Sequence, residues 1–221
     1  MTDKITTIAV IGGTGSEGNG LALRWAHAGY RVIIGSRGAE KAEAAASELN
    51  DILARDGVAG RENPAAAREA DLIVLTVPYA AHQPTLESIR EEAQGKVLVD
   101  VTVPLKPPEV YIVNIPAGRS AAEEAQAILG ADVRVVSAFQ NVSAHHLKHL
   151  DHVIDCDVLV CGDDKEARAT ALALVKAAGM KGINAGPLAN SVVSEGLTAM
   201  LISINRAYGV KDSGIRITGI G

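Results

Sequence analysis

The sequence predicts an α/β protein of the Rossmann type, with a doubly wound, mostly parallel sheet and a small helical C-terminal portion. Two observations predict this class. Short apolar runs alternate with Ala-rich stretches of helical character, an arrangement that builds a parallel sheet with helices on both faces. Near Gly186 this alternation gives way to a mainly helical tail.

Each expected element has a local reason. The run TIAVIG at residues 7–12 is uncharged, as a strand buried on both faces would be, and Gly29 is placed to end the helix after it. Asn63 followed by Pro64 predicts a helix start, and Ser120 with Glu123 forms a capping box. The expected strands are 7–12, 31–35, 71–77, 96–103, 133–139, 157–162 and 182–185, and the expected helices are 16–28, 39–55, 63–69, one opened by Ser120, 164–178 and 190–208.

Composition argues against several classes of protein. The chain has 221 residues, 48% of them apolar, which is enough for a sizeable core. Its net charge of −5 argues against a nucleic-acid-binding protein. No apolar run approaches the roughly 20 residues of a membrane helix, and MTDKITT has no signal-peptide pattern. Cys156 and Cys161 are too few for a disulfide scaffold, so we expect buried, reduced thiols and a cytoplasmic protein.

A glycine-rich loop, IGGTGSEGNG at residues 11–20, lies between the first expected strand and the first expected helix. Gly13, Gly15 and Gly18 match the G-x-G-x-x-G pattern, and Gly12 offers a second frame. Such glycines let the backbone approach a pyrophosphate, which then meets the free N–H groups of the helix N-terminus. We therefore expect a dinucleotide-binding domain over residues 1–150 and a smaller C-terminal portion over 151–221. An acid beside a phosphate is unhelpful, so Glu17 is expected to point to solvent.

The second expected strand indicates which dinucleotide binds. An NAD-binding chain carries an acid there for the ribose 2′-hydroxyl, but this chain has Ser36, Arg37 and Lys41. Two charge-assisted hydrogen bonds to a 2′-phosphate would favour NADP over NAD by a factor of about 10² or more. The alternative is that these cations are ordinary surface charges paired with Glu40 or Glu43. We expect NADP(H).

The residues also resemble a known family, the NADPH-dependent coenzyme F420 reductases, or F420H2:NADP oxidoreductases. The resemblance begins with IAVIGGTGSEGNGLALRWAHAGYRVIIGSRGAEK and continues through LIVLTVPY, VVSAFQNVSA and VCGDD. It ends in GPLANSVVSEGLTAMLISINRAYG and GIRITG, and so covers essentially the whole chain. The combination of these motifs is far more specific than any one of them.

The resemblance implies a Rossmann domain, hydride transfer between NADP(H) and the deazaflavin coenzyme F420, and a homodimer. By position, Thr14, Gly15, Ser16 and Glu17 would touch the pyrophosphate, between the loop glycines Gly13 and Gly18. Ser36, Arg37 and Lys41 match the 2′-phosphate residues, in agreement with the charge argument. The resemblance places Val77 and Pro78 beside the nicotinamide ribose, the stretch Phe139, Gln140, Asn141, Val142 and Ala144 between the two rings, and Thr198 and Ser213 on the deazaflavin side.

Three departures from the family pattern leave the second substrate open. Well-known members carry His at the position of Gln140, Arg at that of Val192, and a small polar residue at that of Gly196. Gln140 can hydrogen-bond a carbonyl but cannot carry a charge. The alternatives are an NADPH-dependent reductase of a flavin or of a small imine or ketone, and a non-catalytic NADP(H)-binding redox sensor. An open slot over the nicotinamide would favour an enzyme.

For hydride transfer between two rings, the protein must set the distance and angle between the rings and exclude water, and it need not transfer a proton. We therefore expect no general acid–base dyad. Gln140 and Asn141 are expected to position the rings. His145, His149 and His152 could share a helical face, and we expect a solvated His-rich surface there in preference to a metal site. His82 is expected near the cleft, more often structural than in contact with substrate. Asp163 and Asp164 are expected to cap a helix.

Overall fold

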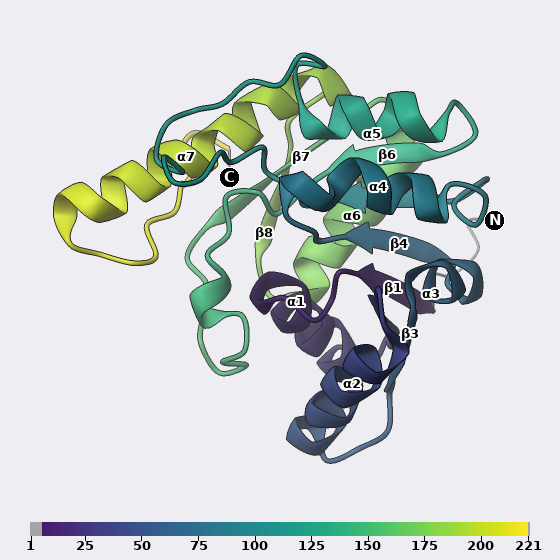
Figure 1. The fold of residues 1–221 in the computed structure, drawn as a ribbon. Helices are drawn as coiled ribbons and strands as arrows, with labels where there is room; N and C mark the ends of the chain where they lie inside the picture. The colour runs from purple at the N-terminus through teal and green to yellow at the C-terminus, as the bar shows by residue number, and fades with distance from the viewer. Residues whose placement is uncertain (1–5, 221) are drawn as a thin grey trace.

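The computed structural model describes residues 6–220 and contains one sheet of eight strands in the order β3-β2-β1-β4-β5-β6-β7-β8 (Figure 1). The first six strands in this order are parallel, β7 runs antiparallel to β6, and β8 is parallel to β7. The strands are β1 Thr7–Ile11, β2 Arg31–Ser36, β3 Val58–Glu62, β4 Leu72–Leu75, β5 Val97–Asp100, β6 Arg134–Ser137, β7 Asp157–Gly162 and β8 Lys181–Asn184.

Helices cover both faces of the sheet because the central strands are apolar on both sides. In β1, Ile8 and Val10 point into one core with α1, α2 and α6, while Ala9 and Ile11 point into a second core with α3, α4 and α5. The helices are α1 Ser16–His27, α2 Ala39–Leu53, α3 Asn63–Glu69, α4 Tyr79–Ile89, α5 Ala121–Leu129, α6 Lys165–Ala177 and α7 Ser191–Tyr208. This is the doubly wound Rossmann-type class, and the expected fold class is confirmed.

Two elements were not expected from the sequence. The edge strand β3 reads VAGRE, whose glycine and charges obscure a strand pattern. Helix α4 carries Pro84 inside it, a residue that normally argues against a helix. Pro84 falls in the second turn of α4. Strand β3 and helix α4 can be recognised only from their packing against neighbouring elements. The expected caps are confirmed at Ser120, which accepts from the Glu123 N–H, and at Asp164, which accepts from the Ala167 N–H.

The His-rich segment is not a helix. It forms a single 3-10 turn, Ala144–His146, followed by irregular chain. Its main-chain carbonyls accept hydrogen bonds from a side chain instead of from the N–H groups of a helix. The buried guanidinium of Arg24 on α1 donates to the carbonyls of Leu147, His149 and Ala178 at 2.8 to 3.0 Å. Among residues 6–220, no three His, Cys, Asp or Glu side chains are grouped as a metal site would need. The segment therefore fastens α1 to the C-terminal half of the chain.

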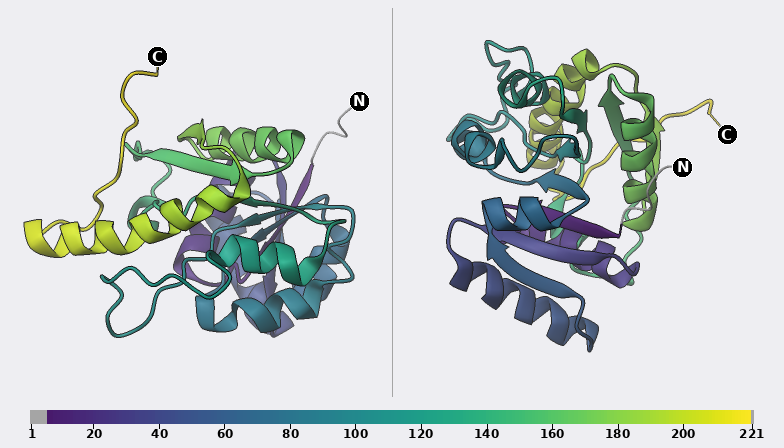
Figure 2. Two further views of the ribbon diagram at one scale, coloured as in Figure 1. Left: turned by 90° about the horizontal axis from the view of Figure 1, so that it is seen from above. Right: turned by 90° about the vertical axis from the view of Figure 1, so that its right-hand side faces the viewer.

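The C-terminal part is joined to the same sheet. Helix α7 reaches beyond the sheet beside the proline-rich loop of residues 104–116, and the chain then returns toward β7 (Figure 2). There the Asp157 N–H donates to Ile215 O at 2.8 Å, and the Ile217 N–H donates to Asp157 Oδ2 at 2.7 Å. A division into residues 1–150 and 151–221 stays a prediction. No helix within residues 6–220 combines the length and apolar character that crossing a bilayer requires.

Candidate functional site

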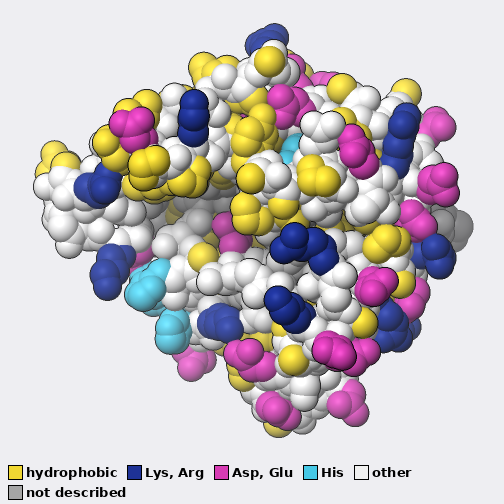
Figure 3. Space-filling model, viewed as in Figure 1, with side chains coloured by type: hydrophobic (Ala, Val, Ile, Leu, Met, Phe, Trp, Pro, Cys, Tyr) yellow, Lys and Arg dark blue, Asp and Glu magenta, His cyan; other side chains and the backbone are white. Residues whose placement is uncertain are grey.

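A cavity of about 1190 Å³ opens at the carboxyl ends of β1, β2, β4 and β5. It lies where the strand order turns around β1, with β2 on one side and β4 on the other, the place at which open α/β sheets bind ligands. Figure 3 shows this face of the molecule, hollowed below α7. The lining residues come from the glycine-rich loop, the ends of β2 to β5, the chain after β6, and α7.

The glycine-rich loop forms the middle of the cavity. Gly12 has a φ of +77°, and a Cβ there would stand 2.6 Å from Val77 Cγ1. A Cβ on Gly18 would overlap the Thr76 hydroxyl, so glycine is what allows α1 to approach β4 this closely. Helix α1 begins here without a side-chain cap, and its first turn offers free N–H groups to an anion. The loop is therefore shaped for a pyrophosphate.

Glu17 does not point to solvent, and that expectation is wrong. Its side chain lines the cavity, and its Oε1 is inaccessible to water without a hydrogen-bond partner among residues 6–220. Burial raises the pKa of Glu17 to about 8. The reason is the close approach of the first turn of α1 to the strands, which encloses the carboxyl group. At neutral pH the group is mostly uncharged, so it does not repel a phosphate.

The cationic end of the cavity, defined by Ser36, Arg37, Lys41 and Asn63, lies where β2 and β3 finish, and Glu40 and Glu62 also line the cavity there. Ser36 is buried, whereas Arg37 and Lys41 are exposed. Within the described chain neither cation lies within 4.0 Å of a carboxylate, so the pairing with Glu40 or Glu43 is not seen. Two unpaired cations beside a buried hydroxyl suit a phosphate dianion.

The ring end of the cavity lies on the other side of the loop and is uncharged. No Asp, Glu, Lys, Arg or His of residues 6–220 lines it. Val77 and Pro78 form one wall, and Gln140, Val142 and Thr198 lie at the same end. A mostly apolar space with few polar groups suits planar rings. The lining of the ring end is Val77, Pro78, Val101, Thr102, Val103, Leu105, Gln140, Val142 and Thr198.

Gln140 is held firmly at the ring end. It is 3% exposed, and its Nε2 donates to the main-chain oxygen of Asp100 at 2.8 Å. Its own main-chain oxygen accepts from Thr198 Oγ1 at 2.6 Å, which ties α7 to the chain after β6. Its Oε1 is buried and has no partner among the described residues. Three separated parts of the chain, the end of β5, residues 139–142 and α7, thus meet at this side chain.

Other residues expected at the site support its walls from behind. Gly13, Gly18, Phe139, Asn141, Ala144 and Ser213 do not line the cavity. The ring of Phe139 packs edge-on against Trp25, with centroids 5.8 Å apart. Asn141 Nδ2 donates to Asp157 O at 2.8 Å, which points this side chain toward β7. The Ser213 N–H donates to Asn205 Oδ1 at 3.0 Å and so anchors the C-terminal segment on α7.

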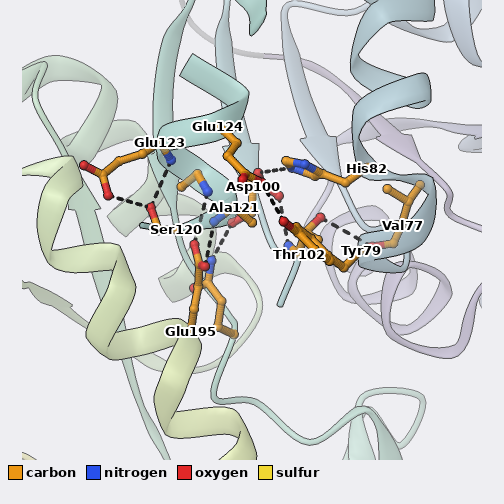
Figure 4. A network of polar contacts seen from close by, with 12 residues as sticks. Val77, Tyr79, His82, Asp100, Thr102, Ser120, Ala121, Glu123, Glu124 and Glu195 are labelled. Atoms are coloured by element: carbon orange, nitrogen blue, oxygen red, sulfur yellow. Dashed lines mark hydrogen bonds and ion pairs between the residues drawn. The ribbon is translucent and has the colours of Figure 1, made fainter. Parts of the chain in front are cut away.

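A buried polar network lies behind the ring end (Figure 4). Asp100, at the end of β5, is fully buried; its Oδ2 lies 2.7 Å from His82 Nε2, and its Oδ1 accepts from the Thr102 N–H at 2.9 Å. Burial lowers the pKa of His82, but the Asp100 carboxylate and its hydrogen bond outweigh burial and raise it overall. The pair does not line the cavity, so His82 is structural and the pair is not placed to exchange protons with a ligand.

Glu195 on α7 extends this network. It is 2% exposed, and its two oxygens accept from the N–H groups of Ala121 and Ala122 at 2.7 and 3.1 Å, at the start of α5. Burial, together with the nearby carboxylates of Asp100 and Glu124, raises its pKa to about 8 against the effect of those N–H groups. Thr198 lies three residues further along the same face of α7. Glu195 therefore sets the position from which Thr198 reaches Gln140.

Sequence reasoning missed Asp100, Asn63 and Glu195. A carboxylate directly after the apolar run VLV at residues 97–99 could have pointed to Asp100, since the carboxyl ends of parallel strands gather at the edge of the sheet that carries the cavity. Asn63 was interpreted only as a helix start, although its Oδ1 is buried at the cationic end without a partner among the described residues. Glu195 carries no local signal, because its partners are main-chain groups 73 and 74 residues away.

Fold and site together define a Rossmann-type, NADP-dependent oxidoreductase. Residues 7–104 match the family model described as NADP oxidoreductase, coenzyme F420-dependent. The F420-dependent NADP reductase of Methanothermobacter thermautotrophicus is 43% identical over 98% of this chain and 96% of its own length. That of Methanocaldococcus jannaschii is 42% identical over 96% of this chain and 98% of its own. The chain belongs to the family of F420-dependent NADP reductases.

Solved structures agree with this placement. A crystal structure from Arthrobacter sp. FB24 matches with a TM-score of 0.79 at 25% identity, over 97% of this chain and 99% of that one. The NADP-bound pyrroline carboxylate reductase of Plasmodium falciparum matches with a TM-score of 0.61 at 12% identity, over 94% of this chain and 67% of that one. The second likeness concerns the fold alone.

Proposed function

We infer that the protein transfers a hydride between NADP(H) and the deazaflavin coenzyme F420. One observation carries this conclusion: a single cavity joins unpaired cations at one end to an uncharged, mostly apolar space at the other. The relatives at 42 and 43% identity over nearly their full length are F420-dependent NADP reductases. The residues present therefore suit both an anionic dinucleotide and a second planar ring.

The dinucleotide would lie across the end of the sheet. We assign Ser36, Arg37 and Lys41 to the 2′-phosphate, because they offer a hydroxyl and two unpaired cations at the cationic end. Thr14, Gly15, Ser16 and Glu17 would line the pyrophosphate position, with Gly13 and Gly18 giving the loop its shape. Val77 and Pro78 would lie beside the nicotinamide ribose, since they stand at the end of β4 beyond the loop.

The chemistry of the reaction belongs to the two coenzymes, which supply and accept the hydride when both are bound. The protein holds the rings and excludes water from the space between them. Val142 and Thr198 would contact the deazaflavin side, and Gln140 would orient a ring. Phe139, Asn141, Ala144 and Ser213 would keep those walls in place from behind. With no charged side chain of the described residues at the ring end, no proton transfer by the protein is assigned.

The alternatives differ in what the ring end would accept. A non-catalytic NADP(H) sensor would have that space covered by protein, whereas here it opens into the same cavity. A reductase of a flavin or of a small imine or ketone would use the same dinucleotide half. Gln140, Val192 and Gly196, where the chain departs from the family pattern, motivate this second candidate. Only a comparison of acceptors separates it from the F420 reaction.

We further propose that the protein is a cytoplasmic homodimer. Helix α7 exposes Val193 at 67% and Tyr208 at 78%, a pattern that a second copy could cover. Cys156 and Cys161 are free and buried, and burial raises the pKa of both thiols, which suits a reducing compartment. Light scattering coupled to gel filtration would test the dimer, and a monomer at micromolar concentration would refute it.

The test of the proposed function is anaerobic mixing of the purified protein with NADPH and coenzyme F420. Loss of the deazaflavin absorbance reports hydride transfer, with NADH and a flavin as controls. Fast bleaching with NADPH and little with NADH supports both the reaction and the assignment of Arg37. If NADPH binds and F420 stays oxidised while a flavin is reduced, the reductase of another acceptor replaces the F420 reaction.

A further inference from the structure

The ring end holds one polar atom that nothing in the described protein satisfies. Gln140 Oε1 is buried and has no hydrogen-bond partner, although the side chain is otherwise tied down. A buried acceptor without a partner is costly, and folded proteins rarely keep one unless a ligand or a water completes it. Gln140 is one of the residues that line the cavity, and it is 3% exposed, so the oxygen lies just beneath the cavity wall.

The orientation of this amide follows from its neighbour. The group 2.8 Å away is the main-chain oxygen of Asp100, which can only accept. The amide nitrogen of Gln140 must therefore face Asp100, and Oε1 must take the other position. Thr198 Oγ1 donates a second hydrogen bond, of 2.6 Å, to the main-chain oxygen of Gln140, and this bond holds the backbone from which the side chain extends. What remains available at the ring end is an acceptor.

Three cavity-lining residues have a buried side-chain oxygen without a partner among the described residues, and these oxygens belong to different parts of the cavity. Asn63 Oδ1 belongs to the cationic end and Glu17 Oε1 to the loop, so both lie on the adenosine and pyrophosphate side. Gln140 Oε1 alone belongs to the ring end, where no charged side chain of the described residues competes with it. A ring that enters this space meets apolar walls and one strong acceptor at a defined position.

We propose that Gln140 is a specificity-determining residue whose Oε1 accepts a hydrogen bond from an amide or imide N–H on the ring bound at this end. The inference rests on the proposed function and deepens it. Two bound rings offer that chemistry: the carboxamide of the nicotinamide and the imide of the deazaflavin. Rings of the same shape that present a methyl group in place of the N–H leave the acceptor buried and unpartnered, and they are rejected.

The first arm of the test addresses the carboxamide by calorimetry, without any second substrate. Binding of NADP⁺ is compared with binding of its 3-acetylpyridine analogue, in which a methyl ketone replaces the carboxamide. If the carboxamide is the donor, the wild-type protein binds NADP⁺ about tenfold more tightly than the analogue. In Gln140→Met, which has no acceptor, the two ligands bind within about twofold of each other. Gln83→Met, the same change at an exposed glutamine outside the cavity, keeps the wild-type ratio.

The second arm addresses the deazaflavin imide. Binding of a deazaflavin and of its N-methylated imide analogue is followed by the fluorescence of the ring, with NADP⁺ present. If the imide is the donor, methylation weakens binding to the wild-type protein about tenfold and has little effect on Gln140→Met. A shift in either arm supports the proposal and identifies the source of the N–H.

Two outcomes overturn the proposal. A wild-type protein that discriminates in neither arm has no acceptor working at this end, and this result needs no variant. Discrimination that survives intact in a folded Gln140→Met or Gln140→Leu protein, checked by thermal melting, belongs to another residue. The first arm is independent of hydride transfer, so a failure of the F420 reaction and a failure of this inference give different results.

Discussion

The two ends of the cavity hold their polar side chains in opposite ways. At the cationic end, Arg37 and Lys41 are exposed and unpaired, and long flexible side chains need only reach a phosphate. At the ring end, Gln140 is buried and fixed through Asp100 and Thr198. Attraction between charges acts over several ångströms and depends little on angle, whereas a neutral hydrogen bond requires a short distance and a nearly linear geometry. Changes at the first end should therefore affect selectivity alone, and changes at the second should also affect folding.

The largest effect is expected behind the ring end, on breaking the buried pair of Asp100 and His82. In Asp100→Asn the imidazole loses the carboxylate that raises its pKa, and the free energy of unfolding should fall by about 3–5 kcal/mol. Urea denaturation measures this. Asp155→Asn, which breaks the exposed pair with Arg216, should cost less than about 1 kcal/mol. Equal losses in the two variants would show that the Asp100 pair is not a structural anchor.

At the cationic end, the double variant Arg37→Ala with Lys41→Ala should lower the preference for NADPH over NADH by about 10²-fold. The reason is the loss of two charge-assisted hydrogen bonds to the 2′-phosphate, which NADH lacks. The ratio of kcat/KM for the two dinucleotides measures the effect, and the melting temperature should hardly change. Arg90→Ala removes an exposed cation outside the cavity and should leave the ratio intact. A comparable loss there would mean that overall charge decides the preference.

Between the two ends, Glu17 should make stability depend on pH. Its carboxyl titrates near 4.5 when unfolded and at about 8 when folded, so the unfolded state ionises first and stability falls as pH rises between these values. Glu17→Gln should remove this part of the slope, so its gain in the free energy of unfolding should be absent at pH 4 and grow as the pH rises toward 8. Urea unfolding across this range measures the gain. Glu40→Gln, exposed at the cavity rim, should show no such gain.

The smallest effect is expected from Thr198→Val, which keeps the side-chain shape and removes the hydroxyl that donates to Gln140. Loss of one hydrogen bond should raise KM for the second substrate a few-fold, in line with about 1 kcal/mol, and leave the NADPH preference unchanged. Thr198→Ser retains the donor and should restore the wild-type value. If the Ser variant behaves like the Val variant, the methyl group of Thr198 matters more than its hydroxyl.

The sequence allowed much of the fold and one end of the site to be predicted, for local reasons. The strand before Gly13 and the helix after it are neighbours in the chain, so their meeting point needs no tertiary information. Ser36, Arg37 and Lys41 come next along the chain, at the end of the second strand and in the first turn of the helix that follows it. Glu17 was wrongly expected in solvent because its chemistry suggested repulsion, whereas enclosure between α1 and the strands shifts its pKa instead.

The ring end could not be predicted in the same detail, because its contacts join distant parts of the chain. Gln140 could be named from a family resemblance, but which of its amide atoms faces the cavity depends on Asp100, 40 residues away. Asn141 has a similar side chain one residue further on, and it faces β7 instead. No pattern distinguishes these two neighbours, since the local backbone after β6 decides their directions.

By itself, the sequence determined the parallel sheet, the glycine-rich loop and the cations that we assign to NADP(H), because periodicity, glycine spacing and charge act within short stretches of chain. Only the tertiary structure decided that the oxygen without a partner at the ring end is Gln140 Oε1 and that Glu17 is buried. It also decided that Glu195 and the Asp100–His82 pair support the wall behind Gln140. Those properties depend on desolvation and on hydrogen bonds whose partners lie on separate elements. Packing, not local sequence, sets both.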